Sequence, residues 1–144
     1  MKNLIYVIVL WMLLGCNHKS TAINDTKDTV DLLKSVLLSK QFIRTLTSEK
    51  DTIYILKTKF YRKSWPLQIG QHQIVYIDDN QQARTISTYP HVDGRMRYGI
   101  SDFKINKDSA VIMIWQFTTP IYIRYHFEKN TGSWKIKSHE MGIQ

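Results

Sequence analysis

Few of the chemically reactive residues in this chain lie at a spacing that a catalytic site requires. Ser101 and Lys104 have the S-x-x-K spacing of a serine nucleophile and its lysine base. That arrangement requires the serine at the start of a helix, so that the lysine lies one turn further on. Residues 97–105 predict a strand, which would place the two side chains on opposite faces. We therefore expect no nucleophile at Ser101.

Histidine and carboxylate side chains are the other candidates for chemistry. His91 and Asp93 share a predicted loop, but no third metal ligand follows at a useful spacing, and a zinc site needs three or four. The sequence predicts no metal and no cofactor, and it favours a binding protein over an enzyme. A small hydrolase is the alternative, in which His91 and Asp93, or one of His126 and His139, would meet a carboxylate.

Length and composition suit one globular domain. The chain has 144 residues, of which 43% are apolar and 22% charged. These values argue against a disordered chain and against a membrane protein with several spans. Lys and Arg number 20 against 12 Asp and Glu, a net charge of +8. Such an excess of positive charge favours an anionic partner.

Residues 1–15 predict a signal peptide. Lys2 precedes an apolar run over residues 4–14. A helix of that length spans roughly 16 Å, about half of a hydrocarbon core, so it is too short for a membrane span. Its length is typical of the apolar region of a secretory signal.

The segment Leu13-Leu14-Gly15-Cys16 ends this run and resembles the lipobox of bacterial lipoproteins. The resemblance implies cleavage before Cys16, acylation of its thiol, and a polar, lipidated tether over residues 16–27. Asn17 in place of Asp favours the outer membrane, and the lack of acids in residues 17–21 favours its periplasmic face. Export excludes nucleic acid as a partner. The alternative is a secreted protein, or a buried first helix, with a chance cysteine.

Residues 28–144 predict a single α+β domain that begins with a helix from Asp28 to about Lys40. Val30, Leu33 and Leu37 form its apolar stripe. Thr26 or Asp28 is the expected N-cap, and the helix has room to continue to Leu46. Residues 79–94 predict a loop, with a short strand near residues 84–87 as an alternative. Segments rich in β-branched and aromatic residues predict six strands: residues 52–60, 73–78, 97–105, 109–117, 121–128 and 133–139.

Short connectors between the last four strands predict antiparallel hairpins. The expected fold is a helix packed on a curved antiparallel sheet of five or six strands. This order, with Gly-Ser-Trp-Lys-Ile over residues 132–136, resembles cystatin-like domains and, as an alternative, NTF2-like domains. NTF2-like folds usually place about three helices before the sheet, which favours the cystatin-like fold. A resemblance of fold does not assign a function.

Side-chain alternation predicts the two faces of the sheet. A four-residue connector at 129–132 and a three-residue connector at 118–120 place Met113, Trp115 and Phe117 in the core, and Ile112 and Ile114 outside. In the strand at 97–105, a bulge near Asp108 would decide whether Tyr98 and Ile100 or Phe103 and Ile105 point inward. The opposite face is the candidate binding surface for an anionic ligand or partner, with a solvated face as the alternative: Tyr122, Arg124, His126, Lys135, Lys137 and His139.

A second basic cluster surrounds three aromatic residues: Lys57, Lys59, Phe60, Tyr61, Arg62, Lys63 and Trp65. It could bind anionic envelope groups, or its lysines could protect an edge strand. The function expected from the sequence is a lipid-anchored, non-catalytic binding or inhibitor module for an envelope protein or an anionic envelope lipid or glycan. An accessory subunit of an outer-membrane assembly is a further alternative.

Overall fold

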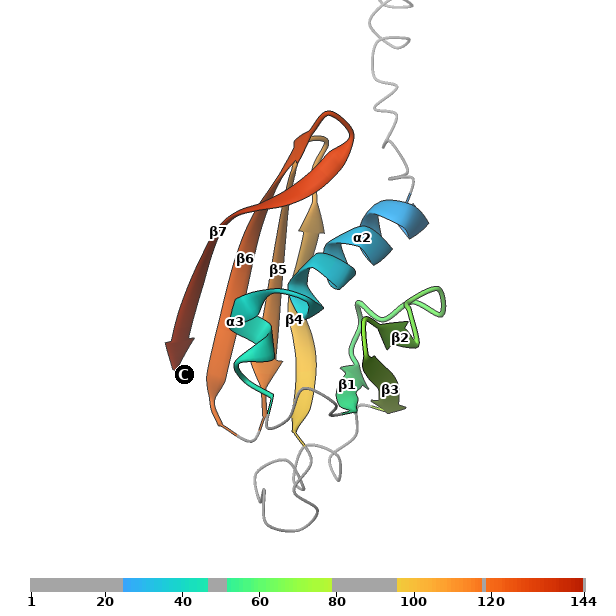
Figure 1. The fold of residues 1–144 in the computed structure, drawn as a ribbon, viewed down its shortest axis with the longest axis vertical. Helices are drawn as coiled ribbons and strands as arrows, with labels where there is room; N and C mark the ends of the chain where they lie inside the picture. Colours follow the sequence, from blue (N-terminus) through green and yellow to red (C-terminus); the bar gives the residue numbers. More distant parts are fainter. Residues whose placement is uncertain (1–24, 47–51, 79–95, 118, 144) are drawn as a thin grey trace, which may run out of the picture.

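The computed structural model describes residues 25–46, 52–78, 96–117 and 119–143. In these residues the chain forms two helices and one seven-stranded sheet, in the order β2-β3-β1-β4-β5-β6-β7 (Figure 1). The elements are α2 (Asp25–Leu37), α3 (Lys40–Ile43), β1 (Ile53–Lys57), β2 (Gln68–Ile69), β3 (His72–Asp78), β4 (Arg97–Ile105), β5 (Ser109–Gln116), β6 (Ile121–Asn130) and β7 (Ser133–Ile143).

The sheet is mixed, whereas the sequence predicted an antiparallel sheet of five or six strands. Strands β4 to β7 are antiparallel hairpin neighbours, as predicted. Strand β1 runs parallel to both of its neighbours, β3 and β4. Parallel neighbours need a long crossover, and residues 58–71 supply one between β1 and β3. A helical segment followed by a sheet agrees with the α+β class, although the sheet is larger than expected.

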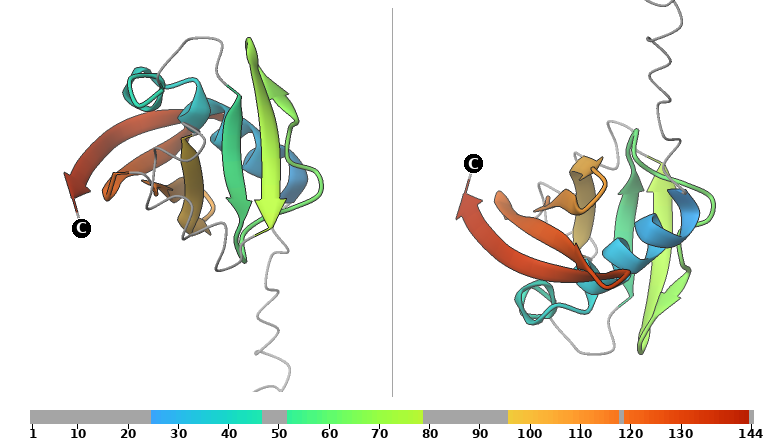
Figure 2. Two further views of the ribbon diagram at one scale, coloured as in Figure 1. Left: turned by 90° about the horizontal axis from the view of Figure 1, so that it is seen from below. Right: turned by 90° about the horizontal axis from the view of Figure 1, so that it is seen from above.

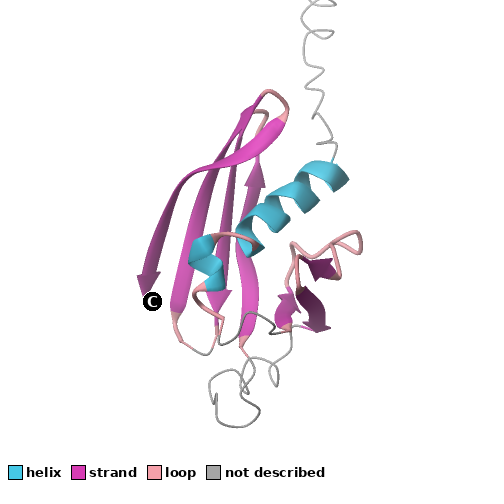
Figure 3. Cartoon of the chain, in the orientation of Figure 1, coloured by secondary structure: helices cyan, strands magenta, loops and turns pink. Residues whose placement is uncertain are grey.

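Helix α2 lies across one face of the sheet, which we call the inner face (Figures 1 and 2). Its fully buried side chains are Leu32, Leu33, Val36 and Leu37. The helix begins at Asp25, so the predicted caps Thr26 and Asp28 lie inside it and the prediction was wrong. It ends at Leu37, and a short turn separates it from α3 (Figure 3). Ser39 caps α3, accepting a hydrogen bond at its Oγ from the Phe42 amide.

The core fills the space between the helices and the inner face. Tyr98, Ile112, Ile114 and Tyr125 are among its buried residues. The Tyr125 hydroxyl lies 2.7 Å from the Ser39 Oγ, which links β6 to the start of α3. Burial raises the pKa of Tyr125. Trp65 from the crossover, 3% exposed, packs against this core, with its ring 6.1 Å from that of Phe103.

The predicted face of β5 was wrong by one residue. Gln116 pairs with Ile121, so the connector has four residues and not three. A shift of one residue turns every side chain to the other face. Ile112 and Ile114 are therefore in the core, while Met113, Trp115 and Val111 point outward.

Two further irregularities set the faces of β4 and β7. A bulge at Ser101 shifts the alternation of faces along β4. Tyr98 and Ile100 before the bulge therefore point inward, and so do Phe103 and Ile105 after it. Both pairs that the sequence offered as alternatives thus pack on the core. The β6–β7 turn has two residues, at 131–132, each with positive φ as a type I′ turn requires. The predicted four-residue turn was wrong.

An ion pair fixes the first turn of α2 to the β6–β7 hairpin. The Lys129 Nζ lies 2.9 Å from the Asp28 carboxylate and 5.1 Å from the Trp134 ring centroid. Both charged side chains are about three-quarters buried. The hydrogen bond from Lys129 holds the pKa of Asp28 below its usual value.

We expect Asp28→Asn to lower the free energy of unfolding at pH 7 by about 1 kcal/mol. Because the folded-state pKa of Asp28 lies below the unfolded one, this contribution is present above the unfolded pKa and is lost as the pH falls through the folded pKa. Urea titrations of both proteins should converge on acidification. Asp31→Asn is the matched control, because Asp31 makes no ion pair with the described residues. An equal loss in both variants would contradict the prediction.

Candidate functional site

The six residues predicted to share a binding surface are divided between the two sides of the sheet. We call the side of β4–β7 that faces away from α2 the outer face. Tyr122, Arg124 and His126 of β6 lie on it, and so does Lys135, which pairs with Glu128. His139 instead pairs with the buried Tyr125 on the inner face, with ring centroids 6.4 Å apart.

A bulge in β7 accounts for this difference. Phe127 pairs with Ile136 and His126 with Ser138, so Lys137 is the extra residue. The alternation of faces shifts by one residue beyond it, which moves His139 inward and Glu140 outward. The predicted four-residue connector at 129–132 would pair Arg124 with Lys137 and Tyr122 with His139. The shorter turn and the bulge pair them instead with Glu140 and Gly142.

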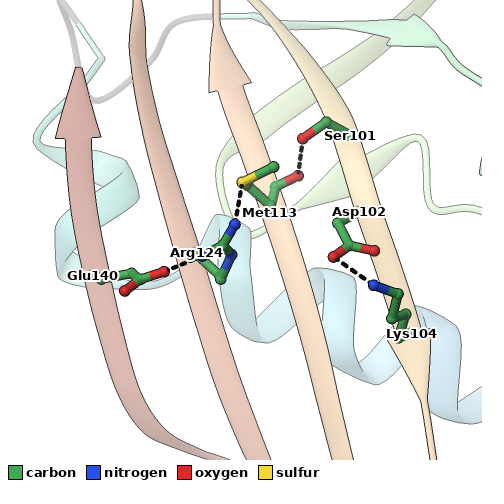
Figure 4. Close-up of polar contacts among 6 residues, drawn as sticks. All are labelled: Ser101, Asp102, Lys104, Met113, Arg124 and Glu140. Carbon is green, nitrogen blue, oxygen red and sulfur yellow. Dashed lines mark hydrogen bonds and ion pairs between the residues drawn. The ribbon is translucent and has the colours of Figure 1, made fainter. Parts of the chain in front are cut away.

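Ion pairs neutralise much of the positive charge on the outer face. Arg124 pairs with Glu140 on β7, and Lys104 with Asp102 at 3.2 Å (Figure 4). Lys137 lies 3.7 Å from Glu128. The sequence indicated a cationic face because Glu140 lay beyond the expected end of its strand. In the described structure the outer face is close to charge balance.

A row of aromatic and glycine residues crosses the outer face of four strands. In register, Gly99 pairs with Trp115, Trp115 with Tyr122, and Tyr122 with Gly142. The Trp115 and Tyr122 ring centroids are 5.4 Å apart. A Cβ on Gly142 would lie 2.6 Å from the Tyr122 ring, and one on Gly99 the same distance from the ring of Phe117. The two glycines thus allow aromatic rings to lie flat on the neighbouring strands.

An apolar groove of about 610 Å³ continues this row toward the end of β1. We call it the outer groove. Its principal walls are the side chains of Phe60, Trp115, Phe117 and Pro120, with Gly99 at its base. The Lys59 Nζ lies 5.1 Å from the Phe60 ring centroid. The Thr58 Oγ1 donates a 2.8 Å hydrogen bond to the Ile100 carbonyl, which fixes this wall to β4.

Sequence reasoning missed the outer groove because it placed Trp115 and Phe117 in the core. The available signal was Gly99, which lies inside the predicted strand at 97–105. A glycine within a strand often marks the close approach of another group.

The second basic cluster does not form one cationic patch. Lys57 pairs with Asp78 at 2.9 Å, and this hydrogen bond raises the pKa of Lys57. The Arg62 guanidinium donates to three backbone carbonyls of its own loop, at residues 59–61. Trp65 belongs to the core. From this cluster, Lys59 and Phe60 line the outer groove.

The described residues bring together none of the predicted catalytic pairs. Among the described residues no ion pair joins His126 or His139 to a carboxylate, and His91 and Asp93 lie outside the described residues. Ser101 donates to the Met113 carbonyl, while Lys104 binds Asp102 (Figure 4). Within the described ranges, no group of three or more His, Cys, Asp or Glu residues could hold a metal ion.

No family model, curated protein or solved structure matches this chain. Of the helices that the structure describes, none is long and apolar enough to cross a membrane. The outer face offers groups for non-covalent contact. It combines an open apolar groove, an aromatic pair, a methionine and an arginine within a nearly neutral polar surround.

Proposed function

We propose that this chain is a lipid-anchored protein of the bacterial envelope that binds another envelope protein through its outer face, as a non-catalytic binding or inhibitor module. The lipobox-like segment ending at Cys16 supports the anchor, and Asn17 supports the periplasmic face of the outer membrane. Cys16 and Asn17 lie outside the described residues. The outer groove supports the binding role.

The observation that carries the proposal is the outer groove with its adjoining aromatic pair. Its volume of about 610 Å³ suits one or two large side chains of a partner. Trp, Tyr and Arg dominate the binding energy of protein interfaces, and Trp115, Tyr122 and Arg124 lie next to one another here. Interface cores are also low in unpaired charge, as this face is.

The charge balance favours a protein over an anionic polymer. A polyanion site needs cations that are free to pair with the ligand. Arg124 and Lys137, which the sequence predicted for that role, already have carboxylate partners. A partner protein can instead bury the aromatic pair and leave those ion pairs at the rim.

We expect Trp115→Ala to weaken capture of the partner by about thirtyfold, because truncation of a central aromatic residue typically costs about 2 kcal/mol. The measurement is quantitative mass spectrometry of proteins retained by the chain from detergent-solubilised envelopes. Leu67→Ala is the matched control, since Leu67 is 70% exposed on the crossover. The melting temperature of each variant separates a lost contact from a lost fold.

Other outcomes identify the alternatives. Binding to vesicles of anionic lipid or to isolated cell-wall glycan that survives Trp115→Ala but is lost in Arg124→Glu, with no protein captured by the parent chain, would overturn the protein partner in favour of an anionic lipid or glycan. Retention unchanged in both variants would show that the outer face is merely solvated. Stoichiometric recovery of an integral outer-membrane protein, dependent on Trp115, would specify the role as an accessory subunit.

A further inference from the structure

Strand β7 is a long terminal strand that pairs with β6 alone. It runs from Ser133 to Ile143, and no described strand pairs with its other edge. Two of its inner-face side chains are exposed: Met141, at 54%, and Ile143, at 79%. A free edge with exposed apolar side chains is a template for the addition of another strand.

The bulge at Lys137 gives β7 an unusual symmetry. On a regular strand, residues an odd number of positions apart point to opposite faces. Lys135 and Glu140 are five positions apart, yet both point outward, because the bulge shifts the alternation between them. Trp134 and Met141 likewise both point inward. The faces of β7 are therefore mirrored about the point between Lys137 and Ser138.

We propose that β7 pairs with the β7 of a second copy of this chain, antiparallel, around a two-fold axis between Lys137 and Ser138. In that register each residue meets one from its own face, as a continuous sheet requires. The opposed pairs, each formed twice, are Lys135 with Glu140, Trp134 with Met141, and Ile136 with His139.

Charge complementarity identifies a second copy as the occupant. The first half of β7 carries Lys135 and Lys137, and the second half carries Glu140. Lysines on an edge strand normally repel an incoming strand. In the two-fold register, Lys135 meets the carboxylate of the other copy, and that carboxylate then lies between Lys135 and the Arg124 to which it is already paired. Registers displaced by one residue in either direction would oppose side chains from different faces near the bulge.

A charge exchange between two variants tests this register. In a dimer of Lys135→Glu, carboxylates at positions 135 and 140 face each other at both symmetry-related places. In a dimer of Glu140→Lys, lysines face each other at the same two places. We expect each variant alone to dimerise about tenfold or more weakly than the parent, and their equimolar mixture to recover the parent affinity as a heterodimer. Because Lys and Glu have nearly the same mass, one variant is labelled with ¹⁵N, and native mass spectrometry of the full, detergent-solubilised chain then distinguishes the three dimers by mass.

The control is Lys104→Glu, which changes an outer-face charge on β4 and should leave the dimer unchanged. A parent protein that stays monomeric at 100 micromolar would overturn the proposal and leave the edge to a strand of another protein. A dimer that persists in both charge variants would place the contact elsewhere. Recovery in the mixture cannot arise from a folding defect, because misfolded chains would not pair.

Discussion

A chain with Ser in place of Cys16 is expected to take up no palmitate analogue and to keep its uncleaved leader. Only the thiol can carry the thioether-linked lipid, and Cys16 is the sole cysteine in the sequence. Each buried CH₂ of an acyl group contributes about 0.8 kcal/mol to membrane binding. Two or three acyl groups therefore hold the parent protein at the membrane, and the variant without them should not be held there. Metabolic labelling with an alkyne palmitate, followed by intact mass, measures both effects.

Asn17→Asp is the matched control for the anchor. The variant keeps the thiol and should label fully, while the sorting rule implied by the lipobox resemblance predicts its retention in the inner membrane. Label that persists in Cys16→Ser, or a parent protein whose mass includes residues 1–15, would contradict the lipoprotein assignment. The binding role of the outer groove would survive that result, but its location in the cell would not.

Leu33→Ala is expected to lower the free energy of unfolding by about 3 kcal/mol. The side chain is fully buried between α2 and the sheet, and truncation removes its transfer energy and leaves a cavity. Urea or guanidinium titration followed by circular dichroism measures the change. The size of this decrease in the free energy of unfolding measures how tightly α2 packs on the inner face.

Leu38→Ala is the control for this prediction, because it removes the same atoms from a residue that is 48% exposed and lies directly after the same helix. We expect less than about 1 kcal/mol from it. Equal losses in the two variants, or a loss below about 1 kcal/mol in Leu33→Ala, would show that α2 does not pack on the sheet in solution.

The strands were predictable because their composition is a local property. The segments rich in β-branched and aromatic residues correspond to β1 and β3–β7 within a few residues, and the short connectors correctly predicted antiparallel order from β4 onward. The parallel pairing of β1 was not predictable in this way, because it depends on where the crossover at 58–71 returns. Nothing within the strand itself encodes that choice.

The candidate site was harder to predict because side-chain faces depend on single residues. Phe117 has the character of a strand residue but belongs to the connector, so Trp115 was placed in the core and the outer groove was missed. The bulge at Lys137 carries no compositional signal, so His139 was placed on the wrong face. Tyr122, Arg124 and His126 were placed correctly because they lie on one strand without interruption.

The start of α2 and the outer groove lie at opposite ends of the sheet. Helix α2 starts near the β6–β7 turn (Figure 1), where Asp28 pairs with Lys129. Pro120, which lines the outer groove, directly precedes the other end of β6, and this strand of ten residues spans roughly 33 Å. Residues 17–24 can extend at most about 30 Å. A lipid at Cys16 would therefore let the groove reach at most roughly 60 Å above the bilayer surface. Because the tether is attached at the opposite end of the domain, the groove is the part of the molecule that a lipid at Cys16 would constrain least.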